Sequence, residues 1–356
     1  MKAFLQPVTV EASLGRGGDN FSLLRHLLAL AVIVSHAFSV GTGAAGDEPL
    51  HTSTGFSLGE HAVNGFFAVS GFLVTMSFVR RGPLDYAVAR ALRIAPALVV
   101  AVLASAFLLG PALTVLPLAE YFRDPQLWRF VEATLTTLKS TAPLPGLFTD
   151  NPFRFPLGTV WTLKYEIICY AVVFGLGVVG ALRRRVVVLA LVGVLVALSL
   201  GLDFLYPEAG KGAQTSIRLP LIFLTGSLLY LYRERLPFSP VIVAGLALAT
   251  WLNAGTPLYH TLLFVASAYG ALWLALAAPV LAPSPRADLS YGLYLYGWPV
   301  QQVLFALFPA VGAAVMIAPA IAISALIAAL SWYLVEQPAL GLKGRLMAAR
   351  RRHASA

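Results

Sequence analysis

Residues 22–42 read SLLRHLLALAVIVSHAFSVGT, an apolar run that contains the ionisable side chains Arg25, His26 and His36. An apolar segment of about 17–25 residues is long enough to cross a bilayer as a helix. The run is therefore predicted to span a membrane. It decides the fold because comparable segments recur along the rest of the chain.

Ten such segments follow one another. They cover residues 22–42, 62–79, 92–110, 159–182, 186–202, 217–232, 239–252, 258–281, 289–308 and 311–335. Lipid cannot satisfy exposed backbone groups, so helices are the expected form. The alternating pattern of a membrane β-barrel is absent. We predict an all-α polytopic membrane protein, a bundle of about ten transmembrane helices that contacts the lipid bilayer directly.

The composition supports this class. Of the 356 residues, 58% are hydrophobic and 12% are charged, and the mean hydropathy is +0.79. Soluble domains carry about 25% charged residues, so a cytosolic enzyme, a nucleic-acid-binding domain, a disordered protein and a small secreted module are excluded. The single cysteine, Cys169, excludes an internal disulfide and a cysteine metal cluster. We expect no metal site and no nucleic-acid partner.

The net charge of +9 is better explained by orientation than by nucleic acid. With a cytoplasmic N-terminus and ten spans, 18 of the 25 Lys and Arg residues fall on the inner side. The inner side then carries about +12 and the outer side about −3. This asymmetry follows the positive-inside rule and predicts that both termini are cytoplasmic. The expected location is the inner membrane of a bacterium.

We expect a single membrane domain over residues 1–340 and a short basic cytoplasmic tail over residues 341–356. Residues 111–158 form one long outer loop that carries seven prolines. Within this loop, apolar residues recur at helical spacing: Leu127, Trp128, Val131, Leu135 and Leu138. This pattern indicates either an amphipathic helix on the outer surface or a plain structured loop.

Ionisable residues inside a span are costly and are therefore functional candidates. Arg25 and His36 are 11 residues apart, about three helical turns, so both lie on one face about 16 Å apart. Arg25 would lie at the cytoplasmic mouth and His36 deeper, an arrangement suited to a long substrate with an anionic head and a reactive far end. Taken alone, Arg25 is also typical of a snorkelling arginine, and His36 of a hydrogen-bonded core histidine.

Other polar residues extend this pattern. Glu166 lies about two turns into the fourth span and could orient the imidazole of His36, or pair with Lys164 or an arginine as a structural bridge. The inner loop after the second span carries four arginines, of which Arg90 and Arg93 share a helix face. Such arginines can clamp phosphate groups, although some of this charge only sets topology.

Six short patterns occur in order along the chain. They are Arg25 with His36, Phe66-Phe67-x-x-Ser70-Gly71-Phe72, Arg90-x-x-Arg93-Ile94-x-Pro96, Trp161-Thr162-Leu163-x-x-Glu166, Ser290-Tyr291-Gly292-Leu293-Tyr294-Leu295-Tyr296-Gly297-Trp298-Pro299 and Val335-Glu336-Gln337-Pro338. Together they resemble the acyltransferase-3 family of integral membrane acyltransferases. One difference stands out, because Gly297 occupies the place where many members have histidine. Either that histidine is dispensable, or this chain takes a different acceptor.

The resemblance implies transfer of an acyl group, usually acetyl, from cytoplasmic acyl-CoA to a hydroxyl of a cell-surface or lipid-linked carbohydrate. Acyl-CoA is then a donor substrate, and no permanently bound cofactor is expected. His36 and Glu166 are the expected catalytic residues, and Arg25, Arg90 and Arg93 would bind the phosphates of CoA. Trp161, Tyr165, Tyr291 and Trp298 could stack on a sugar acceptor or could anchor the protein in the membrane interface.

Two mechanisms are open at this point. In the first, His36 deprotonates the acceptor hydroxyl, and in the second it forms a transient acyl-histidine. Two other classes of protein also remain. A transporter or flippase of a glycan or lipid precursor would favour two related halves with interrupted helices, and the sequence has no such symmetry. A non-catalytic membrane scaffold would leave Arg25 and His36 unexplained.

Overall fold

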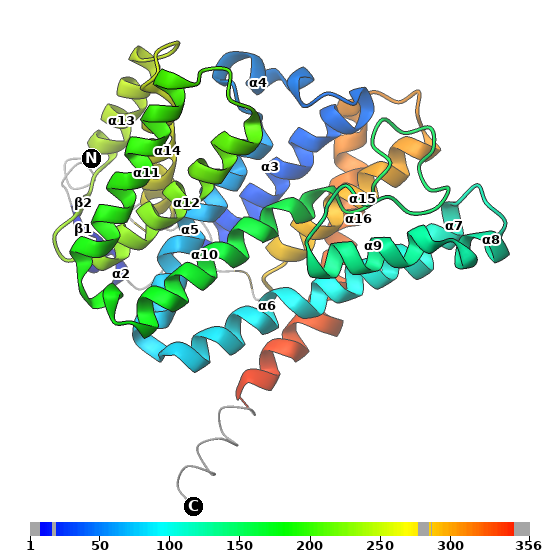
Figure 1. Ribbon diagram of the computed structural model, residues 1–356, viewed down its shortest axis with the longest axis horizontal. Coiled ribbons are helices and arrows are strands. Elements are labelled where there is room, and N and C mark those ends of the chain that lie inside the picture. Colours follow the sequence, from blue (N-terminus) through cyan, green and yellow to red (C-terminus); the bar gives the residue numbers. More distant parts are fainter. Residues whose placement is uncertain (1–7, 16–18, 277–284, 286, 345–356) are drawn as a thin grey trace, which may run out of the picture. The chain divides into compact units, whose positions relative to one another are not determined.

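The computed structural model describes residues 8–15, 19–276, 285 and 287–344. The chain divides into two compact units, each described by itself below. Unit 1 comprises Met1–Arg25, Val63–Tyr86 and Tyr165–Pro285, and unit 2 comprises His26–Ala62, Ala87–Lys164 and Arg286–Ala356. The described chain is helical almost throughout (Figure 1).

Four of the five boundaries between the units fall within long helices. These are α3 (Phe21–Thr42), α5 (Leu58–Arg81), α6 (Pro83–Ala104) and α10 (Trp161–Val178). Unit 1 also contains β1 (Val8–Thr9), α2 (Val10–Leu14), η4 (Ala181–Arg183), α11 (Arg185–Leu205), α12 (Lys211–Leu231), β2 (Pro237–Phe238), α13 (Pro240–Leu252) and α14 (Tyr259–Leu276). Unit 2 also contains η1 (Ala45–Asp47), α4 (Pro49–Thr54), η2 (Ser105–Leu109), α7 (Gly110–Leu113), α8 (Leu118–Arg123), α9 (Pro125–Thr136), η3 (Gly158–Val160), α15 (Ser290–Leu307), α16 (Ala313–Ser331) and η5 (Trp332–Glu336).

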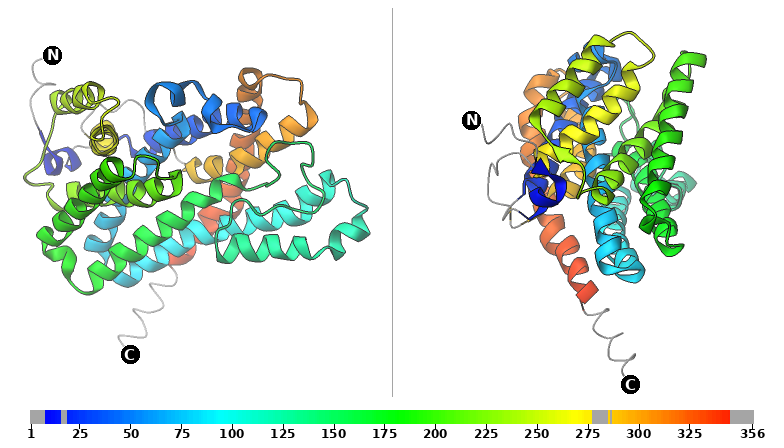
Figure 2. Two further views of the ribbon diagram at one scale, coloured as in Figure 1. Left: turned by 45° about the horizontal axis from the view of Figure 1, so that its top comes forward. Right: turned by 90° about the vertical axis from the view of Figure 1, so that its left-hand side faces the viewer.

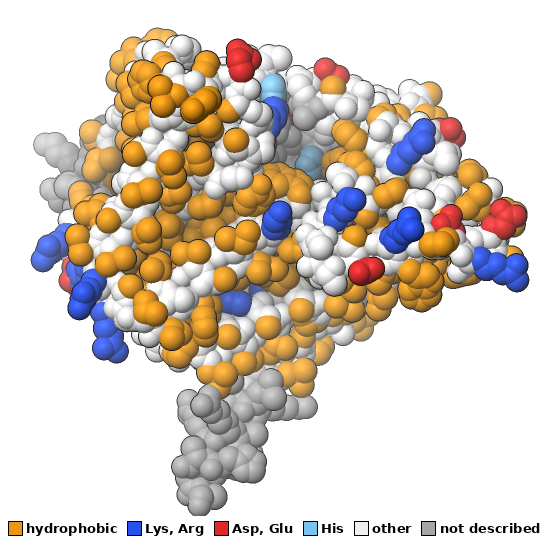
Figure 3. Space-filling view, viewed as in Figure 1, with side chains coloured by type: hydrophobic (Ala, Val, Ile, Leu, Met, Phe, Trp, Pro, Cys, Tyr) orange, Lys and Arg blue, Asp and Glu red, His pale blue; other side chains and the backbone are white. Residues whose placement is uncertain are grey.

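Seven of these helical segments are long and apolar enough to cross a membrane, counted over the described residues. They are Phe21–Thr42, Leu58–Arg81, Pro83–Leu113, Gly158–Val178, Arg185–Leu205, Tyr259–Leu276 and Ala313–Gly344. Their exposed surface is apolar. Along α11, for example, Val186, Val194 and Leu198 are more than half exposed, and hydrophobic side chains cover this helix in Figure 3. A helix that exposes such residues is stable when lipid surrounds it, so the protein is an integral membrane protein.

The predicted all-helical class is thus confirmed, and every one of the ten predicted segments contains a helix. The count of ten spans and the cytoplasmic placement of both termini stay predictions. α13 is a shorter apolar helix of 13 residues. Most of the predicted basic tail lies outside the described residues, as do Lys2, Arg16 and Arg286, which contribute to the expected inner charge.

In unit 1, α12 packs against α11 and α14, and α13 lies beside α14 (Figures 1 and 2). The contact between α5 and α12, here called the α5–α12 seam, depends on two glycines. A Cβ atom at Gly71 would overlap the carbonyl oxygen of Phe223, and one at Gly226 would overlap that of Ala68. Small residues allow such close backbone approach in membrane helices. Thr75 then donates a hydrogen bond to Ser227 across the seam (2.9 Å).

In unit 2, the segment predicted to be an outer loop contains a helix, as the amphipathic alternative expected. It is α9, and its buried side chains are Leu127, Phe130 and Thr134. Trp128, which belongs to the predicted apolar set, is 59% exposed and contacts the ring of Phe107 in a tilted arrangement (ring centroids 5.9 Å apart). Leu138 lies beyond the end of the helix.

Tyr121 anchors the short helix α8 next to α9. Its phenol is fully buried and donates a hydrogen bond to the carbonyl oxygen of Ala106 (2.7 Å) in the π-helical segment η2. Burial raises the pKa of Tyr121 to about 12, because the charged phenolate would lose its hydration. Tyr121 therefore stays a protonated donor at physiological pH, and Gly110 leaves the room that its hydroxyl needs.

Candidate active site

Helix α3 runs without interruption from Phe21 to Thr42, so Arg25 and His36 lie on one helix, as expected. The separation of 11 residues corresponds to about three turns and about 16 Å along the axis. Both side chains are half-buried. The predicted alignment of a cation with a titratable ring on one helix face therefore holds.

The His36 ring lies against Trp298 of α15. The two ring centroids are 5.0 Å apart, and the planes are nearly perpendicular. This contact belongs to what we call the α3–α15 seam, in which the two helices run in parallel. Gly297 faces Ile33 at one level and Gly41 faces Phe305 eight residues further along each helix. Edge-to-face packing fixes the orientation of aromatic rings, so Trp298 holds the imidazole of His36 in one orientation.

Gly297 explains how the seam closes. A Cβ atom at this position would lie 2.7 Å from Cγ1 of Ile33, so any side chain here would require Ile33 to shift. Ile33 thus fills the space next to Gly297. The amide Nε2 of Gln301 also donates a hydrogen bond to the carbonyl oxygen of Ile33 (2.6 Å). Gly297 and Gln301 therefore allow α15 to pack closely against α3 near His36.

Trp298 is held by the end of the outer loop. Its indole Nε1 donates a hydrogen bond to the carbonyl oxygen of Phe155 (3.0 Å), and the Phe155 ring stacks on its face with centroids 5.5 Å apart. Asn151 anchors the same segment by donating to the backbone oxygen of Gln302 (3.0 Å) and to its Oε1 (2.6 Å). Because Trp298 is only 6% exposed, its ring contacts protein on its faces. The structure thus gives it a supporting role beneath the loop.

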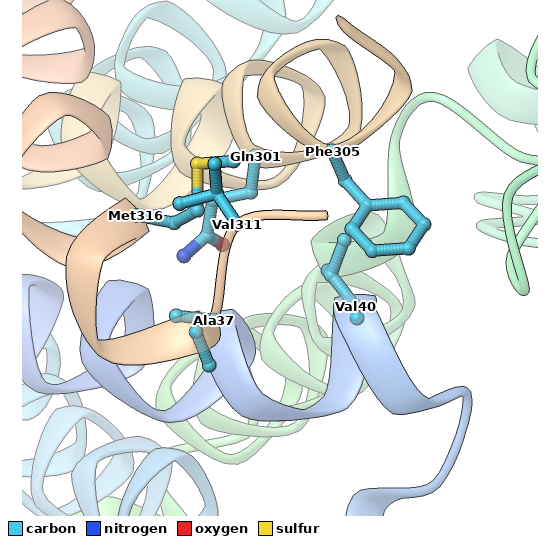
Figure 4. Close-up of a pocket in the computed structure, with 8 residues that line it drawn as sticks. Ala37, Val40, Gln301, Phe305, Val311 and Met316 are labelled. Carbon is cyan, nitrogen blue, oxygen red and sulfur yellow. The ribbon is translucent and has the colours of Figure 1, made fainter. Parts of the chain in front are cut away.

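A small apolar pocket opens in the same seam, one helical turn beyond His36 (Figure 4). The cavity is about 20 Å³. The residues that line it are Ala37, Val40, Gly41, Gln301, Phe305, Val311, Ala313 and Met316. Gln301 is the polar member of this set, and its amide end points toward α3. A small space therefore lies beside α3, next to the residues that directly follow His36 in the sequence.

Glu166 lies in unit 1, on α10. Its Oε1 accepts hydrogen bonds from the hydroxyls of Ser70 (3.3 Å) and Tyr170. The Ser-Gly pattern of α5 and the Trp-Thr-Leu-x-x-Glu pattern of α10 are thus joined by side chains. The alternative pairing of Glu166 with Lys164, an exposed residue, stays a prediction. The pairing of Glu166 with His36, which belongs to unit 2, stays a prediction.

Arg93 of unit 2 has carboxylate partners. It forms ion pairs with Asp288 (2.9 Å) and Glu336 (3.4 Å), and its guanidinium lies over the ring of Tyr291, 5.7 Å from the centroid. The π-helical segment η5 ends at Glu336, whose Oε1 accepts a hydrogen bond from Ser331 five residues earlier (3.1 Å). A π-turn brings residues i and i+5 together. This turn therefore places Glu336 within ion-pair distance of Arg93. Arg93, Tyr291 and Glu336 come from three of the six sequence patterns, which these contacts bring together.

The remaining predicted residues are distributed as follows. Tyr291 is 9% exposed and donates a hydrogen bond to the carbonyl oxygen of Ile94 (3.1 Å), so it supports α6. Arg90 is half-buried on α6, and Trp161 and Tyr165 are half-buried near the start of α10. Their roles in binding CoA or a sugar stay predictions.

Sequence reasoning missed two residues that the structure brings into the site region. Asp288 pairs with Arg93, and Gln301 bonds to α3 and lines the pocket. A signal for Gln301 was present, because Gln301 and Gln302 are adjacent amides inside an apolar span, where polar residues have a default functional interpretation. Asp288 could not be singled out from the sequence in this way, because it lies just before a predicted span and acidic residues are common outside spans.

Comparison with known proteins identifies the family of the chain. The Acyltransferase domain family, acyltransferase-3, matches residues 19–336. The O-acetyl transferase of Shigella phage Sf6 is 28% identical over 301 residues, which cover 80% of this chain and 85% of the relative. Nodulation protein 10 of Rhizobium leguminosarum bv. viciae is 32% identical over 364 residues, covering 93% and 96%. No solved structure shows significant similarity to the chain. The chain therefore belongs to the acyltransferase-3 family and is a membrane-embedded acyltransferase.

Proposed function

We propose that the protein is an O-acetyltransferase that moves an acetyl group from cytoplasmic acetyl-CoA to a hydroxyl of a cell-surface or lipid-linked carbohydrate in a bacterial inner membrane. One observation carries the proposal: His36 lies inside a membrane-spanning helix, oriented by Trp298, on the same face as Arg25 three turns away. The similarity to a protein named O-acetyl transferase supports the acetyl group and the oxygen acceptor. Family membership favours this enzyme over the transporter or flippase alternative.

In the proposed step, the neutral imidazole of His36 takes the proton from the acceptor hydroxyl. The acceptor oxygen then forms a bond to the thioester carbonyl carbon, and the carbon–sulfur bond breaks. The imidazolium returns the proton to the CoA thiolate, so the products are the acetyl ester and free CoA. A carboxylate such as Glu166 would stabilise the imidazolium, in the manner of a general-base dyad.

The test is His36→Ala in purified protein in nanodiscs with radiolabelled acetyl-CoA. General-base catalysis contributes about 10²–10⁴-fold, so transfer and hydrolysis should both fall at least about 100-fold while the melting temperature is kept. His51→Ala, on the outer helix α4, is the matched control. A wild-type rate in His36→Ala would refute the catalytic assignment. Label bound to wild-type protein but not to His36→Ala would select the acyl-histidine variant.

A second test concerns the CoA phosphates. We propose that Arg25 and Arg90 bind them, and that Arg93 has a structural role because Asp288 and Glu336 already neutralise it. A hydrogen bond to a charged group is worth about 1.5–3 kcal/mol, so Arg25→Gln and Arg90→Gln should each raise KM for acetyl-CoA at least about tenfold. Arg93→Gln should instead lower the melting temperature, because Glu336 is only 2% exposed and would lose its cation. An unchanged KM for acetyl-CoA in Arg25→Gln would indicate that Arg25 only extends its charge to the membrane interface and does not bind CoA.

A further inference from the structure

The pocket beyond His36 contains a polar atom without a protein partner. Gln301 is only 3% exposed, and its Nε2 donates to the carbonyl oxygen of Ile33. Because a carbonyl oxygen can only accept, this bond fixes which end of the amide faces Ile33. The other end, Oε1, is buried and has no hydrogen-bond partner among the described residues. A buried acceptor of this kind is unfavourable until a donor reaches it.

The lining of the pocket limits what that donor can be. A cavity of about 20 Å³ has room for one water molecule, but a buried water needs two to four polar partners. The other lining side chains are apolar or absent: Ala37, Val40, Gly41, Phe305, Val311, Ala313 and Met316. A small apolar group that carries a single hydrogen-bond donor matches the pocket better than water does.

The position of the pocket along α3 indicates that the group with the hydrogen-bond donor belongs to the acceptor and not to acetyl-CoA. Ala37, Val40 and Gly41 follow His36 along the helix, whereas Arg25 precedes it by three turns. A donor whose phosphates lie near Arg25 reaches His36 from one side, so the opposite side is left for the molecule that attacks the thioester. An acetyl thioester also has no donor to offer Oε1 of Gln301 at its acyl end.

We propose that this pocket is the acceptor subsite and that Oε1 of Gln301 accepts the hydrogen bond of a hydroxyl on the acceptor, which it turns toward His36. The inference rests on the proposed function and deepens it: the acceptor presents a hydroxyl on a small, otherwise apolar carbon unit. Gln301 is a binding residue in this scheme, and Gly41 and Met316 set the size of the group that enters.

The experiment uses ethanol as the acceptor probe, because it combines two carbons with one donor. Purified protein in phosphatidylcholine nanodiscs receives radiolabelled acetyl-CoA and ethanol, and ethyl acetate is separated from the acetate formed with water. Gln301→Met should lower the ratio of ester to acetate at least about tenfold. Gln302→Met is the comparison, since Gln302 is buried on the same helix but does not line the pocket; because it anchors Asn151, its loss should lower ester and acetate together and leave their ratio unchanged.

Gly41→Ala tests the pocket without destabilising the fold, so misfolding could not explain a fall in its ester ratio. A Cβ atom at Gly41 meets only the Phe305 ring, at an ordinary contact distance of 3.6 Å, and alanine favours a helix over glycine. The melting temperature should therefore stay at or above the wild-type value while the ester ratio falls. A loss of ester with retained stability would assign the effect to the pocket.

Two results would overturn the inference. One is an ester ratio that is equal in wild type, Gln301→Met and Gly41→Ala. The other is hydrolysis of acetyl-CoA by wild type without any ester. In either case hydrolysis that depends on His36 would leave the proposed function intact. Products that form independently of His36 would refute the proposed function itself.

Discussion

The α5–α12 seam and the α3–α15 seam both depend on glycine, and they use it for different purposes. At Gly71 and Gly226 the obstacle to a side chain is a backbone carbonyl, and the hydroxyls of Thr75 and Ser227 bond across the contact. At Gly297 the obstacle is a side chain, Ile33, and the seam opens one turn beyond His36 into the pocket. Close packing alone therefore does not mark a site.

The polar atoms at the glycine contacts also differ between the two seams. Ser227 accepts from Thr75 and lies within hydrogen-bond distance of the carbonyl oxygen of Gly71 (3.2 Å), so its hydroxyl is satisfied within unit 1. The α3–α15 seam instead holds an imidazole ring and the unpartnered Oε1 of Gln301. An unpartnered amide alone does not mark a site, because Asn64 of α5 is also buried without a partner among the described residues; at Gln301 it coincides with a pocket.

The largest expected effect tests the α5–α12 seam. Gly71→Ala forces a methyl group into the carbonyl oxygen of Phe223, and the helices can relieve this only by separating. We expect loss of the folded protein, seen as an aggregated profile in size-exclusion chromatography of the detergent-solubilised chain. Gly175→Ala on α10 is the control, because open space surrounds its Cβ position. A monodisperse, wild-type-like Gly71→Ala would show that the two helices can slide apart.

A smaller effect is expected at the α3–α15 seam. Gly297→Ala overfills the contact with Ile33, and overpacking costs about 1–3 kcal/mol. Since the obstacle is a side chain, Ile33→Ala should relieve part of this cost in the double variant. Thermal unfolding of both single variants and the double variant should give an interaction energy of about 1–2 kcal/mol. Simple additivity would indicate that the backbones, and not Ile33, set the approach of α3 to α15.

The smallest effect concerns the size of the pocket. Met316→Ala removes side-chain atoms from its lining and should admit a longer alcohol. Butanol has two more CH₂ groups than ethanol, and each buried CH₂ contributes about 0.8 kcal/mol, so the yield of butyl ester relative to ethyl ester should rise up to about fifteenfold. Met76→Ala, on α5 in unit 1, is the matched control. An unchanged preference would mean that the alcohol chain leaves the pocket on another side.

The sequence predicted the helices well, because each depends on a local property. Apolar length set the spans, and α3, α10, α11 and α16 lie where it places them. Helix α9 was also predicted from helical spacing, but the spacing did not show which of its apolar side chains the protein buries: Leu127 is buried and Trp128 is exposed. Helical periodicity shows which residues share a face of a helix. It does not show which face the protein buries, because the segments that cover a face come from elsewhere in the chain.

For the site, the sequence alone determined which residues are unusual: Arg25 and His36 on one face, Glu166 inside a span and Gly297 in place of a histidine. Only the tertiary structure decided that Arg93 pairs with Glu336, 243 residues away, that Trp298 is buried beneath Phe155, and that Gln301 leaves an acceptor in a pocket. The physical reason is that burial and hydrogen bonding depend on contacts between helices distant in sequence, whereas hydropathy and helical spacing are properties of each segment by itself.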